Sequence, residues 1–166
     1  MRKNNLSMFL AYNAIVAAVY VATSLAIAPL AFSQFQFRFA EILTVLPFFS
    51  PGLAYGVALG CFITNMFSPF LLGDITIGFL GTVLTVIFVA RGKNLFVATL
   101  WPVLFAIFPA MVVSFYEGLP FLITAAYIMS SEFAVTVVIG YPFYKLLSKN
   151  NYLVSRLSLI PATWGQ

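Results

Sequence analysis

The sequence has no histidine and a single cysteine, Cys61, and each shortage excludes a class of function. A lone thiol cannot form an internal disulfide, and zinc, haem and iron–sulfur sites are built from clusters of His or Cys. Catalysis by a Ser–His or Cys–His arrangement also needs a histidine. No P-loop motif for binding ATP is present either. We therefore expect no cofactor and no enzyme of these types.

Charge is scarce as well: 7% of the residues are charged, whereas 63% are hydrophobic, and the mean hydropathy is +1.06. Soluble domains average about 25% charged residues, and a soluble chain of 166 residues cannot bury this much apolar surface. The composition predicts an integral membrane protein with one domain, residues 1–150, and a cytoplasmic tail, residues 151–166. Membrane topology explains the net charge of +4 better than nucleic-acid binding does.

Four apolar runs are long enough for transmembrane helices, which need about 20 mostly apolar residues. They are residues 6–31, 75–90, 95–115 and 121–147. The region 39–67 is either one broken span or two short helices that separate at Ser50, Pro51 and Gly52. Pro51 suits the first turn of a helix, where its missing N–H costs nothing.

The positions of the basic residues decide between these two topologies, because short cytoplasmic loops carry most Lys and Arg. Six helices with a cytoplasmic N-terminus put all basic residues except Arg38 inside: Arg2, Lys3, Arg91, Lys93, Lys145, Lys149 and Arg156. We therefore predict an all-α membrane protein with six transmembrane helices and both termini cytoplasmic. Its second helix has about 12 residues and is ~18 Å long. That helix is too short for a ~30 Å bilayer core, so its ends must pack in protein or line a cavity.

The four acidic residues all fall on the outer side or near the midplane in this topology. Glu41, Asp74 and Glu117 lie near the outer face, and Glu132 lies ~16 Å into the sixth helix. A carboxylate at the centre of a span costs ~2.5–3.5 kcal/mol, so such residues usually face a cavity and mark function. We predict an outward-facing acidic pocket.

Aromatic and polar residues accompany these acids, and among them Phe37 and Tyr127 are expected at the rim of the pocket, with Asn65 as a neutral polar contact. Acids combined with aromatic faces suit a flat, cationic ligand that forms hydrogen bonds. Glu132 and Glu41 are the residues we most expect to pair with it, and Arg38 would either keep Glu41 ionised or close the rim.

Most of these residues also have a purely structural interpretation. Arg38 and Glu41 are three positions apart and can form an ion pair along one helix face. Asp74 follows a glycine and precedes a helix, where an N-cap is common. Glu117 lies in a turn before Gly118, where a solvated charge is ordinary. Glu132 has no basic residue in its own span, so a function is the stronger interpretation for it.

Small residues recur every four positions in two segments. Ala14, Ala18, Ala22 and Ala26 lie in the first span, and Gly52, Gly56 and Gly60 follow the Ser50 break. Such rows let helices approach closely. Internal packing explains the glycine row, whereas the alanine row is longer than one internal contact requires. The alanine row therefore indicates a docking face for a second membrane protein.

Three sequence blocks resemble a known family. "FRFAEILTVLPFF", "GCFITNMFSP" and "GDITIGFLGT" resemble the QueT family, within the substrate-binding (S) components of energy-coupling factor (ECF) transporters. The resemblance implies a bacterial plasma-membrane subunit that binds a queuosine precursor such as 7-aminomethyl-7-deazaguanine. It also implies partners, namely a transmembrane coupling subunit and two ATPase subunits, and a reorientation of the whole subunit driven by their ATP hydrolysis.

Other functions stay open at this point. The chain could be an S component for another vitamin, or a stand-alone proton-coupled carrier with Glu132 as its proton site. An enzyme or assembly factor is a third possibility, because two carboxylates can perform acid–base chemistry, but the lack of His and paired Cys weighs against it.

Overall fold

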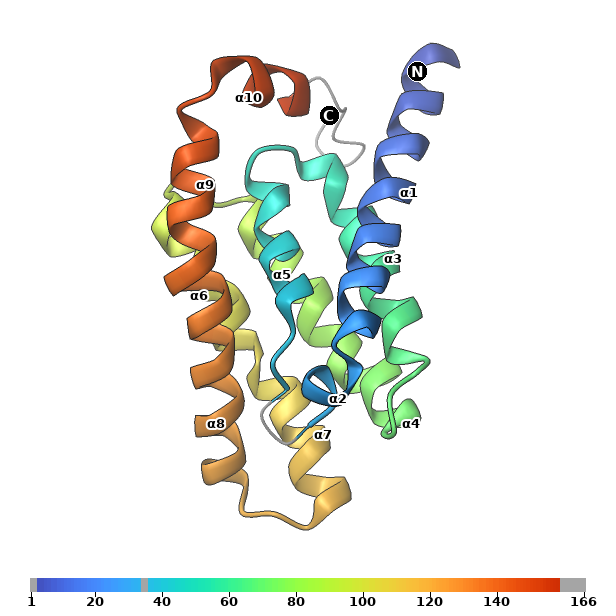
Figure 1. Ribbon diagram of the computed structural model, residues 1–166, viewed down its shortest axis with the longest axis vertical. Helices are drawn as coiled ribbons and strands as arrows, with labels where there is room; N and C mark the ends of the chain where they lie inside the picture. Colours follow the sequence, from blue (N-terminus) through green and yellow to red (C-terminus); the bar gives the residue numbers. More distant parts are fainter. Residues whose placement is uncertain (1–2, 34–35, 159–166) are drawn as a thin grey trace.

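The computed structural model describes residues 3–33 and 36–158, and all regular structure in these ranges is helical. Figure 1 shows that consecutive segments run in alternating directions along the long axis, with the start of α1 and the end of α9 at the same end. Residue 2 and residues 159–166, which include one of the predicted cytoplasmic basic residues and half of the predicted tail, lie outside the described residues.

Helices of three kinds follow one another along the chain. The first half contains α1 (Lys3–Ala26), α2 (Ala28–Ala31), the 3₁₀-helix η1 (Phe39–Phe48), the short 3₁₀ turn η2 (Pro51–Leu53) and α3 (Ala54–Asn65). The second half contains α4 (Leu71–Gly73), the π-helix η3 (Asp74–Gly78), α5 (Phe79–Ala90), α6 (Leu95–Phe105), α7 (Ile107–Glu117), α8 (Phe121–Phe133), the π-helix η4 (Ala134–Gly140), α9 (Tyr141–Ser148) and α10 (Asn151–Ser158).

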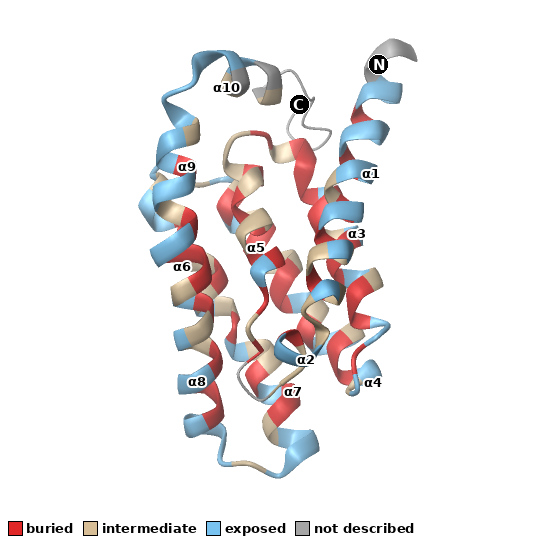
Figure 2. Ribbon diagram, viewed as in Figure 1, coloured by how far each residue is buried: buried red, intermediate tan, exposed pale blue. Residues whose placement is uncertain are grey.

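Four of the described helical stretches are long and apolar enough to cross a membrane: Leu6–Ala26, Leu71–Ala90, Leu95–Glu117 and Phe121–Ser148. They match the four long spans predicted from the sequence, although the first ends at Ala26 and not at residue 31. Their outer surfaces are apolar, with Leu122 79% and Phe115 83% exposed. Figure 2 shows the buried residues turned toward the interior. Exposed apolar side chains on this scale belong against lipid, so the chain is a membrane protein.

The region between the first and second long spans forms two short helical segments, as predicted, and the break falls at Ser50. Ser50 has an extended backbone (φ −148°, ψ 98°), and Pro51 begins the next turn. The prediction of an α-helix of about 12 residues before the break was wrong, because η1 is a 10-residue 3₁₀-helix. A 3₁₀-helix rises about 2.0 Å per residue, which makes ten residues ~20 Å long, nearly the length predicted for the α-helix.

Helix η1 lies in the middle of the bundle and is fixed by side chains from distant helices. The Tyr144 hydroxyl of α9 donates a 2.9 Å hydrogen bond to the carbonyl oxygen of Ile42, and the Tyr20 hydroxyl of α1 donates one to Glu41. Because both tyrosines are fully buried, each bond is shielded from competing water. The short helix is therefore anchored from both sides of the bundle.

Helices α1 and α3 pack closely because α3 has glycines where they meet. A Cβ atom placed on Gly60 would lie 2.7 Å from the Cβ of Tyr20, and one on Gly56 would lie 2.7 Å from the carbonyl oxygen of Asn13. The Gly56 N–H also donates a 2.5 Å hydrogen bond to the Asn13 side-chain oxygen. The internal packing role predicted for the glycine row is therefore present at these two positions.

The third long stretch is interrupted between α6 and α7 at Ala106. Pro102 lies inside α6, and Pro109 follows three residues after the break. A proline inside a helix removes one backbone hydrogen bond and clashes with the preceding turn, which bends or breaks the helix. Asn94 caps the start of α6 by accepting hydrogen bonds from the N–H groups of Phe96 and Val97. The break lies next to a cavity between the helices, because Pro102, Ala106 and Pro109 line it.

Candidate functional site

A cavity of about 30 Å³ lies where η1 meets the second half of the bundle. Four parts of the chain contribute its walls: the residues around the start of η1, helices η3 and α5, the α6–α7 break, and α8. The lining residues are Gln36, Arg38, Glu41, Gly78, Thr82, Thr85, Pro102, Phe105, Ala106, Pro109, Ile128 and Glu132.

Glu41 is held in this wall by Tyr20. The Tyr20 hydroxyl donates a 2.5 Å hydrogen bond to Glu41 Oε1, and Glu41 itself is 9% exposed. A carboxylate accepts up to about four hydrogen bonds, so the bond to Tyr20 leaves Glu41 with capacity to accept others. Tyr20 therefore orients the carboxylate without using all of its acceptor capacity.

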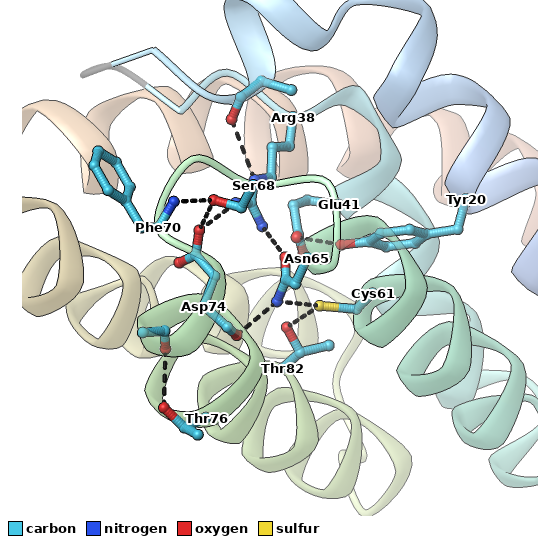
Figure 3. A network of polar contacts seen from close by, with 12 residues as sticks. Tyr20, Arg38, Glu41, Cys61, Asn65, Ser68, Phe70, Asp74, Thr76 and Thr82 are labelled. Atoms are coloured by element: carbon cyan, nitrogen blue, oxygen red, sulfur yellow. Dashed lines mark hydrogen bonds and ion pairs between the residues drawn. The ribbon is translucent and has the colours of Figure 1, made fainter.

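Arg38 is the buried cation of the site, and several groups fix its guanidinium (Figure 3). Its Nε donates to the Ala31 carbonyl oxygen at 3.3 Å, its Nη1 donates to Asn65 Oδ1 at 3.2 Å, and its Nη2 lies 3.8 Å from Asp74 Oδ2. The guanidinium also lies over the Phe32 ring, 5.5 Å from its centroid. Arg38 thus connects the end of α2 with α3 and η3.

The ion pair expected between Arg38 and Glu41 is not formed: no contact of 4.0 Å or less joins their charged groups in the described part of the chain. Arg38 precedes η1 with an extended backbone (φ −108°, ψ 99°), so its side chain does not follow the helix face that carries Glu41. The i, i+3 rule applies only when both residues are helical.

Asp74 forms the second half of the Arg38 network. It is 1% exposed and accepts a 2.5 Å hydrogen bond from the Ser68 hydroxyl, while Asn65 Nδ2 donates a 2.8 Å bond to its backbone carbonyl. The N-cap interpretation of Asp74 was wrong, because Asp74 lies inside a continuous helix that begins at Leu71. Its carboxylate instead balances the buried charge of Arg38, as a buried ion requires.

Three buried polar atoms on the cavity residues have no hydrogen-bond partner: Gln36 Nε2, Arg38 Nη2 and Glu132 Oε1. Gln36 Nε2 and Arg38 Nη2 are hydrogen-bond donors, and Glu132 Oε1 is a carboxyl oxygen. Buried polar groups are satisfied in most proteins, so each such atom in a native structure requires an explanation. All three residues line the same cavity, Gln36 and Arg38 from the segment before η1 and Glu132 from α8.

The predicted site residues divide into three groups. Glu41, Glu132 and Arg38 line the cavity together, whereas Asn65 and Asp74 act behind it by holding Arg38. The remaining three lie away from the cavity lining. They are Phe37, which packs edge-on against Phe39 at 5.1 Å, the exposed Glu117 at the end of α7, and Tyr127, which is 52% exposed.

Several residues of the site were not predicted from the sequence. Gln36 and Tyr20 gave no signal, because a lone amide or tyrosine in an apolar segment has many structural roles. Thr82 and Thr85 are three positions apart on one helix face, and this spacing would have identified them. The two prolines at the α6–α7 break were visible in the sequence, but their position beside the cavity depends on tertiary packing.

The alanine row predicted as a docking face lies on the outer side of α1. Ala14, Ala18, Ala22 and Ala26 are all exposed. The face of α1 that meets α3 contains other residues, including the buried Ala17 and Tyr20. The alanine row is therefore accessible from the membrane side of the molecule.

The size of the cavity limits what this conformation accommodates. Sites for small organic ligands usually have volumes of ~300–1,000 Å³, whereas a single water needs ~10–15 Å³. A cavity of about 30 Å³ holds water-sized groups, so a ring-shaped ligand requires the walls to move apart.

The fold and the site together define a helical membrane protein with a cavity that is lined by two carboxylates and a guanidinium, and with unpaired polar atoms on three of the lining residues. Residues 10–149 match the model of the QueT transporter family. The chain belongs to this family, which confirms the resemblance seen in the three sequence blocks and makes it a membrane transport protein rather than an enzyme. No curated protein and no solved structure matches the chain.

Proposed function

We propose that the chain is the substrate-binding subunit of an ECF-type importer for a queuosine precursor such as 7-aminomethyl-7-deazaguanine. The observation that carries this proposal is the meeting of the buried Glu41 and Glu132 in one cavity, whose lining residues also carry unpaired hydrogen-bond donors. A flat cationic base needs two kinds of acidic contact, one for its ammonium group and one for its N–H edge. The family match supports transport of a small solute.

The chemistry of the precursor fits the groups in the cavity. Its aminomethyl group is a cation that a carboxylate pairs with, and its guanine-like edge has adjacent N–H donors that a second carboxylate accepts in a bidentate manner. Phe105 supplies an aromatic ring in the wall on which a flat base can stack. In this proposal Glu132 binds the ammonium group and Glu41, oriented by Tyr20, binds the N–H edge.

The proposed transport cycle uses six membrane-embedded helical segments, with both termini on the cytoplasmic side of the bacterial plasma membrane. The short segments η1 and α3 would be enclosed by the four long ones, so that their ends contact protein and not lipid. The exposed alanine row of α1 would dock the transmembrane coupling subunit, and two ATPase subunits would supply the energy that reorients the whole subunit.

Calorimetric titration of the purified chain in detergent with 7-aminomethyl-7-deazaguanine tests the substrate. We expect saturable binding at a stoichiometry of one, with no binding of biotin, riboflavin or thiamine in matched titrations. Tight binding of one of these vitamins without binding of the deazapurine would contradict the substrate and would favour an S component for that vitamin.

A stand-alone proton-coupled carrier is a second candidate, favoured by the buried Glu132 Oε1 that lacks a hydrogen-bond partner. Acidic residues inside a membrane often carry protons in pumps and carriers. The two functions differ in their energy source. Uptake that stops when the ATPase subunits are deleted supports the ECF importer, whereas uptake that survives this deletion and stops with an uncoupler supports the carrier.

A further inference from the structure

Most polar side chains that line the cavity already have a hydrogen-bond partner within the protein. Glu41 accepts from Tyr20, Thr82 contacts the Cys61 sulfur at 3.1 Å, and Thr85 donates to the Gly81 carbonyl at 2.9 Å. These groups help to build the wall. The polar atoms that remain without a partner are therefore the ones that most need a contact from a ligand.

Gln36 differs from the other donors in the wall. Its side chain is 3% exposed, and its Nε2 has no hydrogen-bond partner. Arg38 also has an unpaired nitrogen, Nη2, but that nitrogen lies 3.8 Å from the Asp74 carboxylate and its charge is balanced there. Gln36 is thus the one neutral donor among the described lining residues that is both buried and unpaired.

The backbone at Gln36 is also unusual, with φ at +44° in the left-handed region. This conformation is disfavoured for residues other than glycine and persists where the surrounding structure enforces it. Two backbone hydrogen bonds hold the turn: Gln36 N–H donates to the Ser33 carbonyl at 2.9 Å, and Phe37 N–H donates to the Leu30 carbonyl at 3.1 Å. Gln36 lines the cavity together with Arg38, two residues further along the chain.

We propose that Gln36 determines ligand specificity by donating a hydrogen bond from Nε2 to a carbonyl oxygen of the bound base, while Glu132 binds the cationic amine of the same molecule. This inference rests on the proposed function and restricts its substrate class. The ligand must carry a neutral hydrogen-bond acceptor and a cationic donor on one small ring system. A base without the carbonyl acceptor would leave the buried amide unpaired and should therefore bind more weakly.

The test compares two ligands on the full chain in detergent: 7-aminomethyl-7-deazaguanine and its analogue with sulfur in place of the carbonyl oxygen. The analogue keeps the ring N–H edge and the amine, but sulfur is a weak acceptor. We expect the wild-type chain to bind the oxygen ligand about 3- to 10-fold more tightly, the range that one hydrogen bond supplies. In Gln36→Met, which keeps the length of the side chain without a donor, this preference should disappear.

Two further variants distinguish a change in ligand specificity from an effect on folding. Gln36→Asn keeps an amide on a residue that tolerates the left-handed backbone, and it should retain part of the preference. Gln36→Glu replaces the donor by an acceptor and should weaken binding of the oxygen ligand more than Gln36→Met does. In every folded variant, 7-deazaguanine without the amine should bind more weakly than the parent ligand, because its contact with Glu132 is lost.

Each outcome has a distinct meaning. An unchanged preference for oxygen over sulfur in Gln36→Met, or an equal loss of affinity for both ligands, would overturn the role of Gln36 and leave the proposed function standing. In that case Nε2 is satisfied by water or serves only the turn. Failure of the wild-type chain to bind either ligand would overturn the proposed substrate and the role of Gln36 together.

Discussion

Arg38 pairs with Asp74, 36 positions further along the chain, at 3.8 Å between Nη2 and Oδ2, although Glu41 is its nearest acidic neighbour in the sequence. Asp74 is 1% exposed and Arg38 is 7% exposed. The pair joins the segment that enters η1 to the beginning of the second long span. This leaves Glu41 free of a direct ion pair and available to the cavity.

Removing one member of the Arg38–Asp74 pair should destabilise the protein strongly, because the remaining buried charge loses its counter-ion. We expect Arg38→Met and Asp74→Asn each to lower the free energy of unfolding by about 3–5 kcal/mol. The double variant should be more stable than either single variant, since it leaves no charge uncompensated. Thermal unfolding of the detergent-solubilised chain measures all three, with the exposed Glu117→Gln as a control that should behave as wild type. Purely additive losses in the double variant would contradict a direct pairing.

Tyr20→Phe should weaken the positioning of Glu41. The substitution removes only the hydroxyl that donates to Glu41 Oε1, and an unsatisfied buried acceptor costs about 1–3 kcal/mol. We expect a lower melting temperature and a reduced affinity for 7-aminomethyl-7-deazaguanine. Tyr12→Phe on the same helix is the matched control, because Tyr12 is 39% exposed. Equal behaviour of the two variants would show that the Tyr20 hydroxyl plays no role in the site.

Gly60→Ala should destabilise the contact between α1 and α3. The added Cβ would lie 2.7 Å from the Tyr20 Cβ and 3.1 Å from the Ala17 Cα, so one helix must shift. Overpacking of this kind costs about 1–3 kcal/mol. The measurement is again thermal unfolding, with Leu59→Ala, an exposed position of the same helix, as the control. A wild-type melting temperature for Gly60→Ala would mean that the helices separate without cost.

Glu132→Gln should reduce binding without altering the shape of the site. Charge-assisted hydrogen bonds contribute about 1.5–3 kcal/mol, so the affinity for the aminomethyl ligand should fall by roughly 10- to 150-fold. Binding of 7-deazaguanine, which lacks the amine, should change much less. If both ligands lose the same affinity, Glu132 contacts the ring or supports the fold and does not bind the amine.

The sequence predicted the four long spans from hydropathy and the break at Ser50 from the proline that follows it. It also placed Glu41, Glu132 and Arg38 together, because charges are rare in this chain and the predicted topology puts these three on the same side. It did not predict the partner of Arg38. That choice depends on the extended backbone at residue 38, which turns the guanidinium toward Asn65 and Asp74. It also missed the 3₁₀ form of η1, since 3₁₀- and α-helices have similar residue preferences and tertiary anchoring by Tyr20 and Tyr144 holds the helix.

Gln36 shows a second limit of sequence reasoning. An amide in the stretch before η1 resembles any loop polar residue, and its burial, its positive φ and its unpaired Nε2 emerge only once the helices enclose it. In contrast, the four-residue spacing placed the alanines on one helix face, and that face is exposed in the structure.

Ala18→Leu should separate binding from transport. Ala18 is exposed in the middle of the alanine row and does not line the cavity. A larger side chain there prevents close approach of a partner helix, so we expect uptake of the precursor by cells to fall while calorimetric affinity stays at the wild-type value. Val138→Leu, an enlargement at an exposed position of η4, is the matched control and should leave uptake intact. Unchanged uptake in Ala18→Leu would remove the alanine row as the docking face, and a loss of affinity would mean that α1 acts on the site itself.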